Sequence, residues 1–233
     1  VRQEKLRIHY TDGGVHLQRF FDALENDAKT SKVRILHYGD SQIEGDRISS
    51  YLRDKLQKEF GGRGPGYAPP INQVPSMSLK QDNSENWIRY TIFGRKDTTV
   101  KHKEYGLYGI FGRFTPYSND TLPKDSVKAW ITFDRSNIGY SGTRVYRTAT
   151  MLYGNVKEPF KLSVYSNDEL IYSEVLSGST NNEKVKWSFR STPKALRFEF
   201  EGTESPDIYA FRFEDSRGVV VDNIAMRGSS GTI

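Results

Sequence analysis

Apolar residues near the start of the chain follow the spacing of helices and of a buried strand. One set at three- and four-residue steps predicts an amphipathic helix over residues 15–30, packed against a sheet. Its members are Leu17, Phe20, Phe21 and Leu24. The apolar run 33–38 is typical of a buried parallel strand. A second set, with Gly61-Gly62 as the stop signal, predicts a helix over residues 45–60. Its members are Ile48, Leu52, Leu56 and Phe60.

The hydrophobic pattern changes after Pro69-Pro70 to an alternation of apolar and polar positions. From about residue 84 to 221, aromatic-rich alternating runs are separated by clusters of turn residues, which predicts antiparallel strands. The expected strands are 86–94, 108–117, 127–135, 144–154, 160–166, 169–175, 184–190, 195–201 and 207–214. Between two of them, Asn167-Asp168 predicts a hairpin turn. This spacing predicts an antiparallel β-sandwich.

The last segment has an apolar run like that of the first predicted strand. Residues 219–225 form another apolar run, and the loop Gly228-Ser229-Ser230-Gly231 follows it. We therefore predict a partial α/β domain with an inserted all-β sandwich, in which 33–38 and 219–225 pair as parallel strands. The expected parts are residues 1–73 and 218–233 for the α/β domain and residues 74–217 for the sandwich.

The composition excludes several kinds of functional site and a membrane-spanning segment. The absence of cysteine excludes disulfides, thiolate metal sites and cysteine nucleophiles, and four histidines argue against a multi-histidine metal site. No apolar run approaches the ~18 residues that span a bilayer, so we expect no transmembrane segment. Because the chain opens at Val1, we expect that an export signal was removed and that the protein is periplasmic or extracellular.

The net charge of +5 has two interpretations. Lysine and arginine are scattered, apart from Lys101-His102-Lys103, so a solvated and slightly basic surface is favoured and nucleic acid is not an expected partner. Attraction to a polyanion such as an acidic cell-wall polymer is the alternative.

Gly39-Asp40-Ser41 stands between the first predicted strand and the second predicted helix. A serine on a sharp strand-to-helix turn exposes its hydroxyl beside amides that can hold an oxyanion. The alternative is a polar helix cap, in which Asp40 or Ser41 accepts hydrogen bonds from free amides. The apolar strand before the tripeptide and the amphipathic helix after it favour Ser41 as a nucleophile.

The pattern HYGDSQIEGD, followed by FGGRGPGY, resembles the SGNH hydrolase superfamily, also called the GDSL family. The resemblance implies a flavodoxin-like three-layer α/β fold, with Ser41 as the nucleophile and Gly39 and Asp40 as structural members of the motif. The wider pattern looks like a bacterial subgroup that removes O-acetyl groups from polysaccharide or peptidoglycan and carries an inserted, carbohydrate-binding-like sandwich. It implies an acetylated polysaccharide or peptidoglycan as partner, and neither a metal nor an organic cofactor.

The same resemblance implies an oxyanion hole. Its donors are the N–H of Ser41 and a glycine in VVVDNIAMRGSSG, for which Gly231 is the better match and Gly228 the alternative. Later blocks of the family supply an Asn, and an Asp and His that form the base. The chain ends at Ile233, directly after the second block, so we expect this chain alone to be inactive.

Several nearby polar residues have a functional and a structural interpretation. His37 could act as a base, but a buried, hydrogen-bonded strand histidine is favoured. Asp40 is expected to fix the loop through backbone hydrogen bonds. Three residues are expected at the start of the helix, where acceptors and negative charge are favoured; they are Gln42, Glu44 and Asp46. Contact of Glu44 with substrate is the alternative for that residue.

Three tryptophans could stack on sugar rings: Trp87, Trp130 and Trp187. Large aromatics at alternating strand positions are more often core, so at most one is expected to be an exposed platform. Two further functions stay open from sequence. One is a non-catalytic glycan-binding protein, and the other is an acyltransferase that uses the same serine chemistry. The oligomeric state is not indicated.

Overall fold

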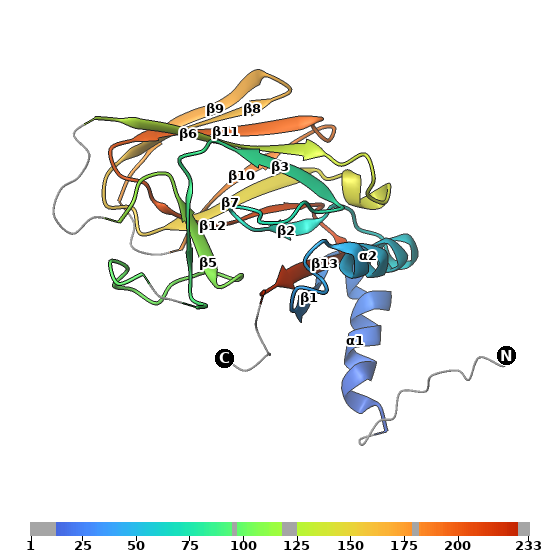
Figure 1. Ribbon diagram of the computed structural model, residues 1–233. Helices are drawn as coiled ribbons and strands as arrows, with labels where there is room; N and C mark the ends of the chain where they lie inside the picture. The colour runs from blue at the N-terminus through green and yellow to red at the C-terminus, as the bar shows by residue number, and fades with distance from the viewer. Residues whose placement is uncertain (1–12, 95–96, 118–124, 179–181, 228–233) are drawn as a thin grey trace.

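The chain is mostly β-sheet with few helices in the computed structural model, which describes residues 13–94, 97–117, 125–178 and 182–227 (Figure 1). Its helices are α1 (Val15–Glu25) and α2 (Arg47–Phe60), with single 3-10 turns at Asp27–Lys29 and Gly142–Arg144. The strands form two antiparallel sheets that face each other and, beside them, one parallel pair.

The two antiparallel sheets build the predicted sandwich. The first has the order β10-β7-β12-β5-β4, with β2 added beside β12, and the second has the order β3-β6-β11-β8-β9. The first comprises β2 (Gly66–Ala68), β4 (Ile88–Thr91), β5 (Ile110–Arg113), β7 (Thr148–Gly154), β10 (Glu183–Ser188) and β12 (Asp207–Glu214). The second comprises β3 (Leu79–Asn83), β6 (Val127–Arg135), β8 (Phe160–Ser166), β9 (Glu169–Leu176) and β11 (Ala195–Gly202).

Sequence patterning located every long strand of this sandwich and missed two short ones. β6, β8 and β12 have the predicted bounds. Asn167 and Asp168 both adopt positive φ, 50° and 69°, as a two-residue hairpin turn of type I′ requires. The strands without a sequence signal are β2 and β3. β2 is three residues long, and β3 (LKQDN) is polar apart from its first residue.

Inward-facing aromatic side chains fill the space between the sheets. Phe133 of β6 is fully buried, and its ring centroid lies 4.7 Å from that of Phe211, 4.8 Å from Phe213 and 5.9 Å from Phe198. Phe198 belongs to the same sheet as Phe133, whereas Phe211 and Phe213 come from β12 across the core. These contacts join the two layers directly.

Replacing Phe133 by alanine is expected to lower the free energy of unfolding by about 3–5 kcal/mol, because it leaves a ring-sized cavity between the sheets. Urea denaturation monitored by tryptophan fluorescence measures this change. The matched control is Phe21→Ala on α1, where the ring is 46% exposed and we expect a loss below about 1 kcal/mol. Equal losses for both variants would contradict this account of the core.

The predicted parallel pairing of the two chain ends is present. β1 (Lys32–Gly39) and β13 (Gly218–Ala225) run side by side from the pair Lys32–Gly218 to the pair Gly39–Ala225. Within the described residues these two strands, with α1 and α2, are the α/β part of the chain. The larger three-layer domain and the boundaries at residues 73 and 217 therefore stay predictions.

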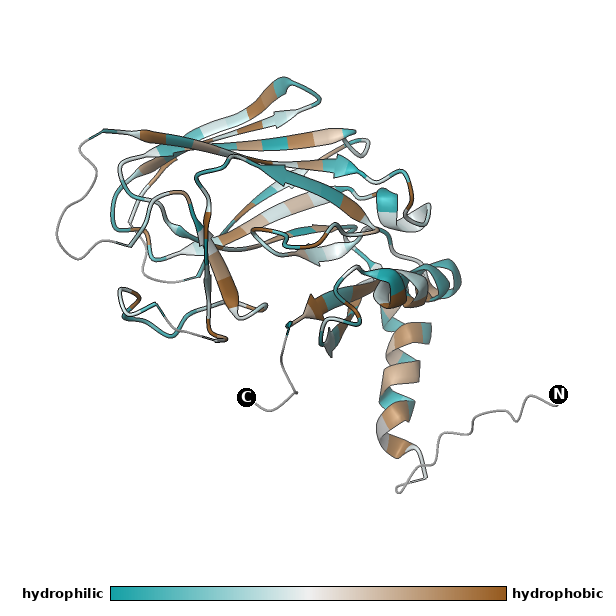
Figure 2. Ribbon diagram, viewed as in Figure 1, coloured by the Kyte–Doolittle hydropathy of each residue, from teal (hydrophilic) through white to brown (hydrophobic). Residues whose placement is uncertain are grey.

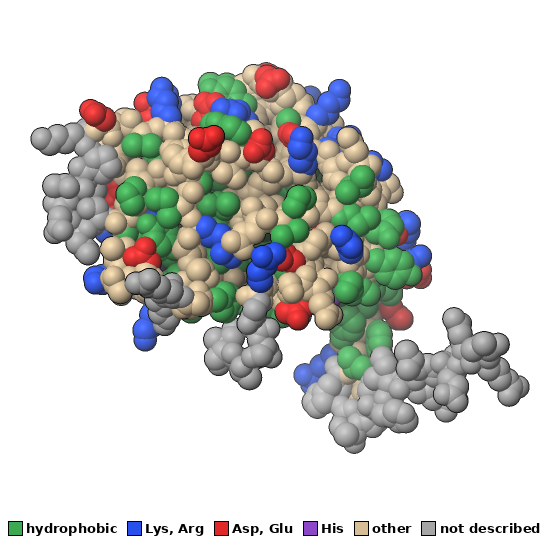
Figure 3. Space-filling view, in the orientation of Figure 1, with side chains coloured by type: hydrophobic (Ala, Val, Ile, Leu, Met, Phe, Trp, Pro, Cys, Tyr) green, Lys and Arg blue, Asp and Glu red, His purple; other side chains and the backbone are tan. Residues whose placement is uncertain are grey.

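The helix α2 packs in a way that its apolar pattern did not indicate. Ile48 and Leu52 are 48% and 41% exposed, whereas a largely polar face is buried against β13 and neighbouring loops. The buried residues are Ser49, Ser50, Arg53, Asp54 and Gln57. Figure 2 shows the mixed character of this helix, and Figure 3 shows apolar side chains gathered over α1 and α2. Of the apolar set, Leu56 and Phe60 pack toward Val219 and Val221.

Hydrogen bonds to backbone carbonyls explain why the polar face is the buried one. Arg53 Nε donates to the Val221 carbonyl at 2.7 Å, and Gln57 Nε2 donates to the carbonyls of Val219 at 3.1 Å and Gly64 at 3.2 Å. Buried polar side chains are tolerated when such partners are present. They fix α2 at one position along β13.

An ionic cluster joins the parallel pair to the sandwich. Arg34 on β1 pairs with Asp222 on β13 at 2.5 Å and with Glu214 on β12. Lys32 also pairs with Glu214, and Arg212 Nε lies 3.1 Å from the same carboxylate. Asp222 also accepts a hydrogen bond from the Tyr67 N–H at 2.8 Å. Both carboxylates are buried, so this cluster is a central part of the contact between the two regions.

Candidate functional site

The turn that carries Ser41 lies at the carboxyl end of β1. β1 ends at Gly39 and α2 begins at Arg47, so residues 40–46 form an irregular turn between strand and helix. This is the predicted place of Ser41, although the helix begins two residues later than expected. At this end of parallel strands, α/β proteins commonly bind ligands.

Both polar groups of Ser41 are available to a ligand. The side chain is exposed, and within the described part of the chain neither its hydroxyl nor its N–H has a hydrogen-bond partner. An N–H without a protein acceptor can donate to the oxyanion that forms on a substrate's carbonyl oxygen when the adjacent hydroxyl attacks the carbonyl carbon. The turn can therefore present a nucleophile and one oxyanion donor from the same residue.

The two residues before Ser41 shape the turn. Asp40 Oδ1 accepts the Gln42 N–H at 2.8 Å, which is an Asx turn rather than a helix cap. Gly39 leaves room for the buried Ile43 side chain, because a Cβ on residue 39 would lie 2.9 Å from Ile43 Cδ1 and would force that side chain to shift. The Asx turn at Asp40 bends the chain after the strand.

The far end of the turn is held by a buried ion pair. Asp46 adopts φ 60° and lies next to Arg53, with the closest atoms 3.0 Å apart. Asn223 of β13 donates from Nδ2 to the Ile43 carbonyl at 2.6 Å and to Asp46 Oδ1 at 3.2 Å. These contacts anchor the turn to the second parallel strand.

The polar residues of the turn do not have the position expected from sequence. Gln42, Glu44 and Asp46 precede α2 rather than occupying its first turn, which contains no acidic residue. Asp46 flanks the helix start, but its carboxylate caps no helical N–H and binds Arg53 instead. The left-handed conformation of Asp46 delays the helix to Arg47 and turns its side chain toward α2.

His37 is directed to α2. Its Nδ1 lies 2.9 Å from Ser49 Oγ, and the residue is half-buried. This corresponds to the hydrogen-bonded strand histidine favoured from sequence. Within the described residues, no side chain contacts the Ser41 hydroxyl as a base would.

The chain after β13 returns to the Ser41 turn. The Met226 N–H donates to the Gly39 carbonyl at 2.8 Å, and Arg227 donates to Glu44 Oε2 from Nη2 at 2.9 Å and from Nε at 3.1 Å. The glycines predicted as oxyanion donors, Gly231 and its alternative Gly228, lie outside the described residues. Described residues up to 227 thus lead directly to the turn.

A cavity of about 80 Å³ lies between this turn and the sandwich. Glu44, Asp46, Asn223 and Ala225 line it on one side. Sandwich residues line the other side, among them Tyr67, Arg89, Tyr108 and Ile110. No sequence pattern indicated Arg89 or Tyr108 as site residues, because β4 and the turn before β5 approach the Ser41 turn only in the folded chain.

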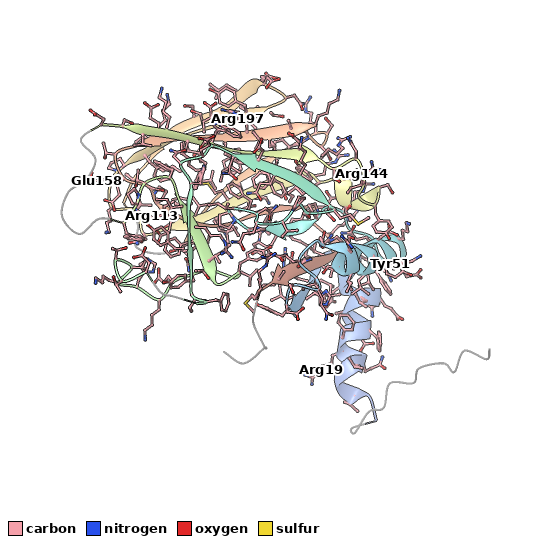
Figure 4. All side chains as sticks on the ribbon, viewed as in Figure 1. Arg19, Tyr51, Arg113, Arg144, Glu158 and Arg197 are labelled. Atoms are coloured by element: carbon pink, nitrogen blue, oxygen red, sulfur yellow. The ribbon has the colours of Figure 1, made fainter. Side chains whose placement is uncertain are left out.

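The three tryptophans differ in their surroundings. Trp187 is buried in the core, and Trp87 packs against the core and donates from Nε1 to the Trp130 carbonyl at 3.1 Å. Trp130 is half-buried on the outer face of β6, and the guanidinium of Arg197 lies 4.5 Å from its ring centroid. Figure 4 labels Arg197 on the same sheet. Trp130 borders a shallow hollow that also includes Tyr165. Trp130 is therefore the candidate platform.

The described residues contain no group of three or more His, Asp or Glu side chains arranged to hold a metal ion. In the same residues, neither α1 nor α2 is long and apolar enough to cross a membrane.

Comparisons with known proteins give matches among the solved structures. No family model and no curated protein matches the chain. A solved structure described as "Peptidoglycan O-acetylesterase in action, 5 min" superposes with a TM-score of 0.58 and 19% identity over 92% of this chain. The match covers 52% of that chain, so the present chain spans about half the length of this neighbour.

Carbohydrate-binding modules are also among the neighbours. A family 6 module matches with a TM-score of 0.33 and 11% identity over 59% of this chain and 87% of its own. A family 35 module from Paenibacillus barcinonensis matches with a TM-score of 0.32 and 14% identity over 56% of this chain and 89% of its own. At 19% identity, the peptidoglycan O-acetylesterase match shows fold alone: this chain has the fold of part of that protein.

Proposed function

We propose that this chain carries the nucleophile and the sandwich of an SGNH-type serine esterase that removes O-acetyl groups from a bacterial polysaccharide or peptidoglycan. The observation that carries the proposal is Ser41, exposed at the end of a parallel strand with its hydroxyl and N–H unpartnered among the described residues. The shared fold with part of a peptidoglycan O-acetylesterase supports it.

The chemistry follows from these two groups. Ser41 Oγ attacks the acetyl carbonyl while a base takes the hydroxyl proton, and the Ser41 N–H donates to the oxyanion. The C–O bond to the sugar then breaks, the sugar oxygen receives that proton, and an acetyl-serine remains. Water cleaves the acetyl-serine to acetate and free serine. Gly231, or Gly228, is the proposed second donor, and a His–Asp pair from outside the described residues is the proposed base.

The proposed substrate implies a place in the cell. Acetylated polysaccharide and peptidoglycan belong to the bacterial envelope, so we propose a periplasmic or extracellular protein, in agreement with the expectation from sequence.

The test is release of acetate from O-acetylated peptidoglycan by the natural protein in full, followed enzymatically. We expect acetate release that requires Ser41. Transfer of the acetyl group to an added sugar, with no free acetate, would identify an acyltransferase instead. Binding to the glycan without either product would leave glycan binding as the function.

A second candidate function rests on the outer sheet face. A glycan-binding role is favoured by the half-buried Trp130 beside Arg197 and Tyr165, because aromatic faces stack on sugar rings. Trp130→Ala should then abolish retention of the protein on insoluble peptidoglycan. Unchanged retention would remove Trp130 as a platform, and Trp130→Phe is the control that keeps an aromatic ring.

The 233-residue chain by itself is expected to hydrolyse p-nitrophenyl acetate no faster than its Ser41→Ala variant. The reason is that no described side chain is placed to take the serine proton. Initial rates at neutral pH measure this. Turnover that depends on Ser41 would reveal a base within this chain, and His37→Gln would then be the first variant to test.

A further inference from the structure

The cavity beside the Ser41 turn carries polar atoms that no described protein group satisfies. They are Arg89 Nε, Tyr108 Oη and Asn223 Oδ1. Tyr108 is 5% exposed, so its hydroxyl is enclosed in the wall of the cavity. Buried polar atoms in folded proteins nearly always have a partner, and three orphans around one cavity indicate a missing one. A cavity of about 80 Å³ has room for several water molecules or for one small polar group.

The charges around the cavity leave one guanidinium without an anion. Glu44 is paired with Arg227, and Asp46 is paired with Arg53. Arg89 forms no ion pair or side-chain hydrogen bond among the described residues. Burial lowers the pKa of Arg89, Glu44 opposes this, and Arg227 adds to it. Two carboxylates and two guanidiniums line the cavity, and Arg89 is the guanidinium among them without a paired carboxylate, so an anion in the cavity would supply its partner.

The remaining unpartnered polar atoms indicate which hydrogen-bonding groups a ligand would need. Burial, with Asp222 and Asp46 nearby, raises the pKa of Tyr108 well above its ordinary value, so Tyr108 is a neutral O–H donor. Asn223 uses Nδ2 for the Ile43 carbonyl and Asp46, which leaves Oδ1 as an acceptor. The cavity thus offers donors to an anion and one acceptor to a neighbouring hydroxyl.

We propose that this cavity binds the carboxylate of an acidic sugar residue. The carboxylate accepts hydrogen bonds from Arg89 and Tyr108, and an adjacent sugar hydroxyl donates to Asn223 Oδ1. Glu44 and Ala225 line the cavity and adjoin the Ser41 turn, so the sugar would lie next to the proposed nucleophile. The sugar part of this proposal rests on the proposed esterase function, whereas the carboxylate part rests on the cavity alone.

The test compares two sugars that differ at one carbon. The 233-residue chain is titrated with glucuronate and with glucose, which carries a hydroxymethyl group in place of the carboxylate, and backbone amide shifts are followed by NMR. We expect glucuronate to bind at least about tenfold more tightly, because hydrogen bonds to a charged group are the strong ones. The shifts should centre on Arg89, Tyr108 and Asn223. Equal affinity for both sugars, or no binding of glucuronate, would overturn the proposal.

Three variants locate the binding groups. Arg89→Gln should weaken glucuronate binding about tenfold or more, and Tyr108→Phe should weaken it severalfold. Tyr108→Phe removes an oxygen that has no hydrogen-bond partner, so the melting temperature of this variant should not be lower than that of the unchanged chain. Tyr209→Phe is the matched control, because Tyr209 is equally buried but does not line the cavity. Unchanged affinity in Arg89→Gln, with a normal melting temperature, would refute the site.

Failure of this proposal and failure of the esterase function give different results. Ser41→Ala should bind glucuronate as the unchanged chain does, since Ser41 does not line the cavity. Loss of selectivity for the carboxylate with Ser41-dependent acetate release intact would refute the cavity proposal alone. Selective binding in a protein whose acetate release does not require Ser41 would refute the esterase alone.

Discussion

Replacing Ser41 by alanine in the natural protein is expected to lower kcat for acetyl-ester hydrolysis on the order of a thousandfold or more. The variant lacks the oxygen that forms the acetyl intermediate, although its backbone N–H remains in the turn. Residual turnover would come from substrate binding and the oxyanion donors. The measurement is kcat and KM for p-nitrophenyl acetate and for acetate release from peptidoglycan.

The control for this variant is Ser188→Ala, an exposed serine on β10. It should keep full activity. We expect Ser41→Ala to lose kcat with little change in KM, because the side chain is small and exposed and makes no described contact that a substrate would need. A loss of less than about tenfold would remove Ser41 from the role of nucleophile.

Replacing Arg34 by methionine is expected to lower the free energy of unfolding by about 3 kcal/mol or more. Arg34 is 23% exposed and lies between two carboxylates with 0% and 1% exposed side chains, Asp222 and Glu214. Methionine can fill part of the space but leaves the two buried charges with fewer partners. Asp222 would lose its ion pair, while Glu214 would keep Lys32 and Arg212.

Urea denaturation at pH 7 measures this effect, and Lys128→Met is its control. Lys128 is 78% exposed and lies 3.7 Å from Glu201, so its loss should cost less than about 1 kcal/mol. Similar losses in both variants would show that the buried cluster contributes no more than a surface ion pair.

The effect of Arg34→Met should also depend on pH. Burial works against the ionised form of Glu214, but Arg34, Lys32 and Arg212 outweigh it and hold its pKa below the ordinary 4.5. This stabilisation is complete above pH 4.5 and is lost as the pH falls through the folded-state pKa. Burial raises the pKa of Asp222 and Arg34 opposes this rise, so loss of Arg34 raises that pKa further and destabilises the ionised carboxylate in the same direction as at Glu214.

The difference in stability between the two proteins should therefore be larger at pH 7 than at pH 3, because a fall in pH favours a proton on each carboxylate and a protonated carboxyl no longer needs Arg34. Unfolding curves at the two pH values test this. A difference that grows toward low pH would contradict this account, because Arg34 favours the ionised form of both carboxylates.

Local sequence patterns determined much of the fold, and the reason is geometric. Side chains alternate across a strand with period two, so β6, β8 and β12 could be located from their apolar positions and the hairpin from Asn167-Asp168. The apolar runs at the two chain ends likewise predicted the parallel pairing of β1 and β13. The Gly-Asp-Ser tripeptide gave the place of Ser41, because a strand, a turn and a helix follow one another in the chain.

Contacts between distant segments were decided by the tertiary structure alone. The polar face of α2 is buried because Arg53 and Gln57 find carbonyl acceptors on β13, more than 160 residues away in the chain. Arg89 and Tyr108 reach the Ser41 turn because the sandwich packs against the parallel pair. A helical period shows which side chains share a face, but the partners available after folding decide which face is buried and which polar groups form a site.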